Sequence, residues 1–262
     1  MDARYVQIAA QATFLLLETV WLDFGPSLPQ IATMIAVALI MEAAHTRLTR
    51  AALNWKSALS TGLSLSLLLR THDPLLWAAA SVVAMGSKYL IRVNGKHLFN
   101  PSAFAIAVLL AAAPHVWVSP GQWGTHIWLA ALAGAFGGLV LTRVARLDIA
   151  LVFLGCRAAF LTGRAWSLGD PWVIPLHQMQ SGGLLIFALF MLTDPRSTPD
   201  SRIGRAVFAA AVAALAHYLF FQWQIRDAVF FALIAVSCAT PVIDRLFPGP
   251  RFAWSGAPVA GG

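Results

Sequence analysis

The sequence predicts an all-α polytopic membrane protein of about ten transmembrane helices, arranged as two inverted five-helix repeats. The chain has 262 residues, of which 59% are hydrophobic and only 11% are charged, whereas soluble domains carry about 25% charged residues. Its apolar residues gather into runs that approach the roughly 20 residues needed to cross a bilayer. Two of these runs share a sequence pattern, and their positions in the order of segments require them to cross the membrane in opposite directions. This composition excludes a soluble enzyme.

Ten apolar segments follow one another along the chain. The N-terminal run has no clear small-residue cleavage site, so we expect a first helix rather than a signal peptide. The predicted segments are residues 5–22, 28–45, 57–70, 75–91 and 99–114 in the first half, and 125–142, 148–163, 176–193, 203–222 and 227–246 in the second. We expect one transmembrane domain over residues 1–247, with repeats at about 5–114 and 125–247. The tail, 248–262, is rich in Gly, Pro and Ala and is predicted to be flexible.

The basic residues give this arrangement an orientation. Fourteen of the eighteen Lys and Arg residues lie at the termini or near the loops that follow even-numbered segments. Because loops on the cytoplasmic side collect Lys and Arg, both termini are predicted to be cytoplasmic. The net charge of +7 is therefore interpreted as the basic residues of the cytoplasmic loops and termini. We expect contact with the lipid bilayer and no nucleic-acid partner.

An internal repeat supports the two-half arrangement. Residues 62–74 read GLSLSLLLRTHDP and residues 183–195 read GLLIFALFMLTDP, with Gly-Leu and Asp-Pro at the same spacing. These copies belong to the third and eighth segments, so an odd number of crossings separates them and their directions are opposite. In inverted repeats, Gly-broken helices at matching places indicate a binding site. Gly62, Gly182 and Gly183 are the candidates, and close helix packing is the alternative explanation.

The segment before the fifth helix carries the most polar candidate site. Asn94 with the following Gly predicts a turn, while Asn100 and Pro101 suit a helix N-cap and the first helical turn. A helix N-terminus with an amide side chain can bind an anion or the polar edge of a flat heterocycle. An ordinary helix cap is the alternative.

Three further charged residues lie in or beside apolar segments. Asp194 and Asp244 end the eighth and tenth segments on the predicted cytoplasmic side. Such acids cap helices, pair with neighbouring Arg residues, or admit ions or protons. Arg157 falls within the seventh segment, where a charged side chain needs a partner or a wet cavity, and we expect an acidic or carbonyl partner. No C-x-x-C motif, nucleophile–base pair or metal-ligand cluster is evident, so we expect no iron–sulfur cluster or metal site.

Several strings resemble one known family. FNPSAF at 99–104, SGGLLIFALFMLTDPRSTP at 181–199, TGLSLSLLL at 61–69 and GGLVLTRVARLD at 137–148 resemble the NqrB/RnfD family. Its members are membrane subunits of the sodium-pumping NADH:quinone oxidoreductase and of the Rnf ferredoxin:NAD complex. The resemblance implies ten helices in two inverted repeats, similar to urea transporters, in the bacterial cytoplasmic (inner) membrane. It also implies other membrane or periplasmic redox proteins as partners.

The resemblance implies a non-covalent flavin, riboflavin or FMN, near a cytoplasmic N-x-F-N-P segment. This places Phe99, Asn100 and Pro101 at the site, with His97 where the family has the first Asn. Asp194 and Asp244 would correspond to the family's membrane-boundary acids. The outer loop PHVWVSPGQWGT at 114–125 lacks the S-G-A-T motif to which members attach a second flavin, so no covalent flavin is expected.

The leading functional hypothesis is therefore a membrane electron-transfer subunit that resembles RnfD and NqrB. It holds a non-covalent flavin where the repeats meet and passes electrons to or from partner proteins. Two alternatives stay open, and both use the same fold. One is a small-solute transporter or channel, and the other is a structural subunit of a larger redox complex without its own cofactor. The sequence leaves open whether the chain is itself an enzyme.

Overall fold

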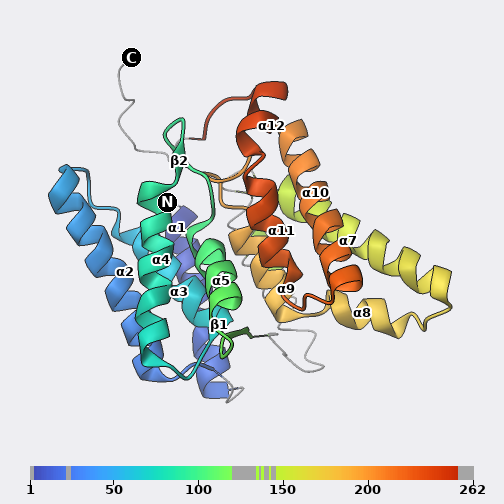
Figure 1. Cartoon of the computed structure of the whole chain (residues 1–262), viewed down its shortest axis with the longest axis horizontal. Helices are drawn as coiled ribbons and strands as arrows, with labels where there is room; N and C mark the ends of the chain where they lie inside the picture. Colours follow the sequence, from blue (N-terminus) through green and yellow to red (C-terminus); the bar gives the residue numbers. More distant parts are fainter. Residues whose placement is uncertain are drawn as a thin grey trace.

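A computed structural model describes residues 3–21, 25–119, 134–135, 137–138, 142 and 146–252. The helices of the first half stand together on one side of the molecule and those of the second half on the other (Figure 1). The first half contains α1 (Ala3–Leu16), the π-helix η1 (Leu17–Trp21), α2 (Leu28–Thr49), α3 (Trp55–Leu68), α4 (Pro74–Leu90) and α5 (Pro101–Ala112). The second half contains α7 (Leu147–Leu168), α8 (Val173–Met179), α9 (Gly182–Ile186), the π-helix η2 (Phe187–Met191), α10 (Arg202–Trp223), α11 (Ala228–Ser237) and α12 (Thr240–Leu246).

Two short strand pairs accompany the helices, where the sequence predicts helices and loops alone. Strand β1 (Leu69–Arg70) pairs antiparallel with β4 (Trp117–Val118), and β2 (Arg92–Val93) pairs with β3 (Lys96–His97). The β2–β3 hairpin turns at Asn94 and Gly95, whose φ values of 52° and 80° are those of a tight hairpin turn. This confirms the predicted turn and places Lys96 and His97 on its return strand.

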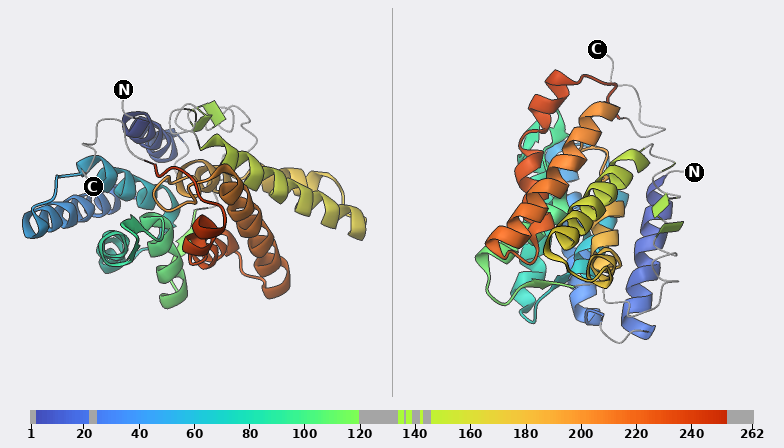
Figure 2. Two further views of the ribbon diagram at one scale, coloured as in Figure 1. Left: turned by 90° about the horizontal axis from the view of Figure 1, so that it is seen from above. Right: turned by 90° about the vertical axis from the view of Figure 1, so that its right-hand side faces the viewer.

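The helices pack first within each half and then across the boundary. In the first half α2 packs on α3 and α4, and α4 packs on α5; in the second half α10 lies between α7 and α11. The two halves meet where α5 packs against α11. One apolar core runs through both halves, and its centre holds the ring of Phe187, 5.5 Å from Phe153 and 5.3 Å from Phe230. Figure 2 shows that the two groups fan out from this shared centre.

Two segments predicted as single helices are bent. The segment predicted at 176–193 bends by 49° between α8 and the α9–η2 helix, and the segment predicted at 227–246 bends by 53° between α11 and α12. At the first bend Ser181 accepts a hydrogen bond from the Leu184 N–H, so a new helix begins there. At the second, Pro241 lies in the first turn of α12, where its missing N–H is tolerated.

The described part of the chain suits a multi-pass membrane protein. Within it, α2, α7 and α10 are each long and apolar enough to cross a bilayer, and each bent pair adds one more candidate span. Most of the predicted 125–142 helix, residues 120–125 of the loop at 114–125 and the tail beyond residue 252 lie outside the described residues. The other predicted segments coincide with observed helices to within a few residues, apart from the bends.

Candidate functional site

A cavity of about 300 Å³ opens between the two halves. Its wall combines the ends of α1 to α5 in the first half with η2 and residues 193–196 of the second. The volume is at the lower end of the range for small-molecule sites. Both segments singled out in the sequence, FNP at 99–101 and TDP at 193–195, contribute to this wall.

Asn100 caps α5 and faces this cavity. Its Oδ1 accepts the N–H of Ala103 at 3.0 Å, and Pro101 is the first residue of the helix, as the sequence predicts. The cap uses only the oxygen, so the amide nitrogen of Asn100 remains a donor for a ligand. Phe99 is buried and stacks on Phe104 at 4.9 Å instead of lining the cavity. Of the predicted FNP residues, Asn100 and Pro101 contact the cavity directly.

His97 joins the FNP segment to the TDP segment. Its Nε2 lies 3.0 Å from the Asp194 carboxylate. Burial raises the pKa of Asp194, but the charge of His97 and hydrogen bonds from His97, the Arg196 N–H and the Ser197 hydroxyl outweigh it, so the net shift is downward. Asp194 is therefore ionised at neutral pH and pairs with His97 in the first half. Its suggested role in ion or proton entry stays a prediction.

A second polar group forms the wall on the α2–α4 side. The Glu42 carboxylate accepts hydrogen bonds from the Lys88 ammonium at 2.8 Å, the Tyr89 hydroxyl at 2.7 Å and the Asn54 N–H at 3.0 Å. The ring of Tyr89 stacks on His45 at 3.8 Å. The sequence places Glu42 near a helix end and indicates no partner for it. The sequence does not predict these partners, because they lie on α4 and in the loop after α2.

A stripe of hydroxyl groups runs along one face of α3. Ser57, Ser60 and Ser64 recur every three or four residues and line the cavity, so they lie on one face of the helix. The buried Gln11 of α1 fixes two of them, donating to Ser64 at 2.7 Å and accepting from Ser60 at 3.0 Å. This stripe is not among the predicted features, although a helical period of Ser within an apolar run is a usable signal.

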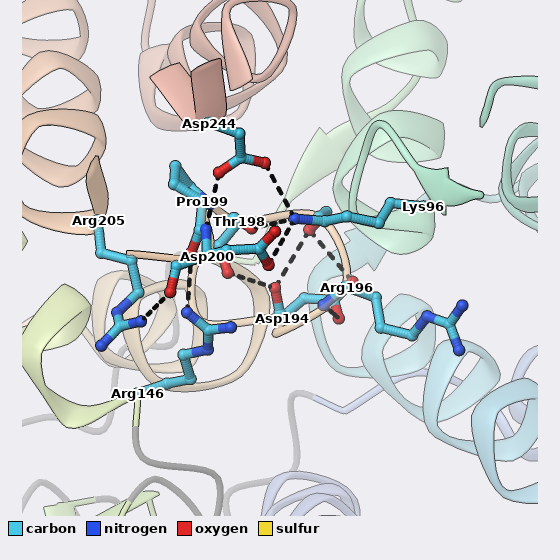
Figure 3. Close-up of polar contacts among 10 residues, drawn as sticks. Lys96, Arg146, Asp194, Arg196, Thr198, Pro199, Asp200, Arg205 and Asp244 are labelled. Atoms are coloured by element: carbon cyan, nitrogen blue, oxygen red, sulfur yellow. Dashed lines mark hydrogen bonds and ion pairs between the residues drawn. The ribbon is translucent and has the colours of Figure 1, made fainter. Parts of the chain in front are cut away.

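A network beneath the β2–β3 hairpin ties the two halves together (Figure 3). The Lys96 ammonium donates to the Thr198 carbonyl at 3.0 Å, the Asp200 carboxylate at 2.9 Å and the Asp244 carboxylate at 3.2 Å. Asp244 also accepts the N–H of Asp200 at 2.8 Å. Asp244 is therefore paired with Lys96 and not with a neighbouring Arg, which is one of the alternatives that the sequence leaves open. Asp200 and Lys96 are not among the predicted site residues, since their contact spans 104 residues.

Two arginines hold the loop at 194–200 from the opposite side. Arg146 donates to the Pro199 carbonyl and Arg205 to the Asp200 carbonyl, both at 2.8 Å. Arg205 also pairs with Asp148. Burial, followed by repulsion from Arg205, lowers the pKa of Arg146 to about 10, so Arg146 is charged at neutral pH. The loop that carries the TDP segment is thus fixed by side chains from three directions.

The other predicted site residues lie away from the cavity. Gly62 faces α2, where an added Cβ would come within 2.9 Å of the Ile35 Cα, so its role is close helix packing. Gly182 and Gly183 begin α9 just after the bend and do not line the cavity.

Arg157 of α7 is 7% exposed, and its Nε and Nη1 have no hydrogen-bond partner among the described residues. Its guanidinium carbon lies 5.8 Å from the centre of the Phe220 ring. Among the described residues, these two nitrogens therefore lack the acidic or carbonyl partner that the sequence predicts for Arg157.

Known proteins resemble this chain over most of its length. Residues 115–252 match the profile of the "NQR2, RnfD, RnfE family". A component of the ion-translocating oxidoreductase complex of Stutzerimonas stutzeri is 30% identical, over 72% of this chain and 73% of the relative. The corresponding component from Halorhodospira halophila is 26% identical over 86% and 84%. A component of the proton-translocating ferredoxin:NAD(+) oxidoreductase complex of Clostridium ljungdahlii is 24% identical over 75% and 74%.

Proposed function

This chain belongs to the NQR2, RnfD, RnfE family, and we propose that it is a membrane electron-transfer subunit of an ion-translocating oxidoreductase complex. In this proposal it holds a non-covalent flavin in the cavity between its halves and exchanges electrons with other subunits. The observation that carries the proposal is that Asn100 and Pro101 of FNP and all three residues of TDP, which are distant in sequence, line one cavity of small-molecule size. A bound flavin would supply the redox chemistry, and the protein would supply position and polarity.

The side chains of the wall suit the polar edge of a flavin ring. The amide nitrogen of Asn100 donates, and the hydroxyls of Ser57, Ser60 and Thr193 add further polar contacts. The apolar side chains of Leu189 and Phe190 cover another part of the wall. Most of the lining residues are polar or charged, so the wall is more polar than that of a typical small-molecule site. The His97–Asp194 pair keeps the two contributing segments together.

The proposal includes the inverted ten-helix arrangement in the bacterial inner membrane, with both termini cytoplasmic. Packing supports it, since α5 and α11 are the fifth elements of the two repeats and contact each other. Both are short, with 12 and 10 residues, as expected of matching discontinuous helices at a repeat interface. Accessibility of single cysteines introduced at Arg50 and Arg226, on predicted opposite sides, tests the orientation. Labelling of both from the same side would contradict it.

Flavin content tests the function. The purified wild-type protein from flavin-replete cells should show flavin absorbance, and Asn100→Ser should lose most of it. Ser keeps the helix cap but removes the amide donor, so this variant separates ligand binding from folding. Asn94→Gly is the matched control, because Asn94 lies in the hairpin turn outside this cavity. A colourless wild-type protein would refute the flavin proposal and favour a structural subunit.

The same preparation tests whether the chain carries a covalent flavin. The chain is proposed to carry no covalent flavin, because the loop at 114–125 lacks S-G-A-T. A denaturing gel viewed under ultraviolet light should then show no fluorescent band at the mass of the chain. A fluorescent band would mean that another residue carries the attachment.

A further inference from the structure

A cluster of basic and aromatic side chains joins α7 to α10, away from the cavity between the halves. The two helices pack against each other and diverge toward their C-terminal ends (Figures 1 and 2). The guanidinium carbon of Arg157 lies 5.8 Å from the centre of the Phe220 ring. Phe221 lies 4.8 Å from Phe220, and its ring also contacts His217 at 4.6 Å and the guanidinium of Arg164 at 4.3 Å. The cluster thus comprises Arg157, Phe160 and Arg164 of α7 and His217, Phe220 and Phe221 of α10, none of which lines the cavity.

Arg157 is buried without a counterion among the described residues. It is 7% exposed, and its Nε and Nη1 have no hydrogen-bond partner there. The Nδ1 of His217, in the same cluster, is buried in the same way. Burial of unpaired polar groups is unfavourable, and the permanent charge of an arginine adds to the cost. The cluster therefore lacks an anion.

The described carboxylates of the chain do not supply this anion. None of them forms an ion pair with Arg157. Six of them pair with other basic residues: Glu18, Glu42, Asp148, Asp194, Asp200 and Asp244. Two further acids, Asp2 and Asp23, lie outside the described residues. An anion from another molecule would complete the cluster.

The depth of Arg157 selects the kind of anion. The helix α7 is a candidate membrane span of 22 residues, and its length of about 33 Å matches a hydrocarbon core of about 30 Å. Arg157 is its eleventh residue, so it lies near the bilayer midplane, roughly 15 Å from either surface. Lipid phosphates lie outside the hydrocarbon core, farther away than an arginine side chain extends. A carboxylate on a neighbouring membrane helix can lie at the same depth as Arg157.

We propose that Arg157 is the docking point for a transmembrane helix of another subunit, and that this helix carries an Asp or Glu at mid-bilayer depth. Ionisable side chains within membranes pair with one another, and a guanidinium offers paired donors to a carboxylate. Phe160 is 37% exposed, and His217 and Phe220 are only partly buried. These side chains supply contact surface around the charge, and rotation of His217 or Phe220 admits the carboxylate to Arg157.

Association with a synthetic transmembrane peptide tests this docking point. The peptide is a membrane-spanning Leu-Ala helix with one Glu at its centre, and the comparison peptide carries Gln there. Energy transfer from donor-labelled protein to acceptor-labelled peptide measures association in vesicles of neutral phosphatidylcholine. The Glu peptide should associate about tenfold more tightly than the Gln peptide, because only the carboxylate is charged.

Variants of Arg157 identify the residue that recognises the carboxylate. Arg157→Met should abolish the preference for the Glu peptide, and Arg157→Lys should retain part of it because it keeps the charge. Arg226→Met, at an exposed Arg outside the cluster, is the matched control and should leave the preference unchanged. Equal association of the two peptides with the wild type, or an unchanged preference in Arg157→Met, would overturn the inference.

Two further measurements exclude other counterions. The melting temperature of Arg157→Met should not fall; a fall of several degrees would mean that the chain itself supplies the counterion and would overturn the inference. In vesicles that contain anionic phosphatidylglycerol the preference for the Glu peptide should persist. Its loss there would assign Arg157 to lipid phosphate and would also overturn the inference. None of these measurements uses a flavin, so their outcome is independent of the proposed flavin site.

Discussion

Removal of the Lys96 ammonium should destabilise the joined halves. Lys96→Met keeps most of the side-chain volume but leaves the carboxylates of Asp200 and Asp244 without their shared cation. The exposed fractions of the three side chains are 17%, 8% and 23%. Breaking a fully buried pair from one side costs about 3–5 kcal/mol, and the partial exposure reduces this. We expect the free energy of unfolding to fall by about 2–3 kcal/mol.

Thermal unfolding of the purified protein in detergent measures this loss. For a chain of this size 1 kcal/mol corresponds to roughly 2–4 °C, so the melting temperature of Lys96→Met should fall by about 5–10 °C. Arg245→Met is the control, because Arg245 is an exposed neighbour of Asp244 on α12 and its loss removes the same charge. Its melting temperature should stay close to that of the wild type.

A double-mutant cycle identifies the cause of the change. If Lys96 acts through Asp244, then Lys96→Met combined with Asp244→Asn should cost less than the sum of the single variants, by about 1 kcal/mol or more. Strict additivity, or a Lys96→Met effect no larger than that of Arg245→Met, would refute the reasoning that this network holds the halves together.

Four other predictions follow from buried or paired groups. Arg157→Met should leave the melting temperature unchanged or higher, because two nitrogens of Arg157 are buried without described partners; a fall of several degrees would reveal an unrecognised partner. Glu18→Leu should lower stability by about 3–5 kcal/mol, since it strands the Arg70 guanidinium now 2.9 Å from Glu18, and adding Arg70→Met should restore much of the loss. Asn100→Ala should be about 1 kcal/mol less stable than Asn100→Ser, because only Ser retains a cap; equal melting would contradict the cap. The pKa of Asp194 is lowered from the ordinary 3.8, so ionised Asp194 stabilises the fold fully above pH 3.8, and this stabilisation is lost as the pH falls through the lowered pKa. The difference in melting temperature between wild type and Asp194→Asn should therefore narrow only in that acidic range. A narrowing near neutral pH would contradict the lowered pKa.

The sequence predicts local structure well wherever the signal is local. It predicts a third segment at 57–70, where α3 spans Trp55–Leu68, and it predicts the cap at Asn100 and the turn at Asn94. Each of these depends on neighbouring residues, whose chemistry alone decides the outcome. The sequence marks Gly182 and Gly183 as a break in the eighth segment, and the bend lies directly before them. Its angle of 49° depends on packing against distant elements, which neighbouring residues do not reveal.

Contacts between the halves are beyond the sequence. His97 and Asp194 are 97 residues apart, and Lys96 and Asp244 are 148 apart. A single sequence gives no distance between such positions, so for these acids it leaves helix capping, pairing with an adjacent Arg, and ion or proton entry as alternatives. The observed pairs differ because the hairpin at 92–97 folds over the boundary and brings its basic strand against the TDP loop. For Gly62 the close approach of Ile35 favours the alternative of helix packing that the sequence leaves open.

The two ties at the cavity differ in what they fix. The Lys96 network holds the hairpin to α12 and to the loop at 198–200 of the second half. The His97–Asp194 pair instead joins the residues that precede Asn100 to those that precede Arg196. The first tie therefore sets the distance between the halves, and the second sets the position of a hydrogen-bond donor relative to a cation across the same cavity. Because consecutive residues on a strand point to opposite faces, Lys96 and His97 can serve these two tasks from adjacent positions of β3. A one-residue shift of this strand would turn both side chains to the opposite faces and break both ties at once.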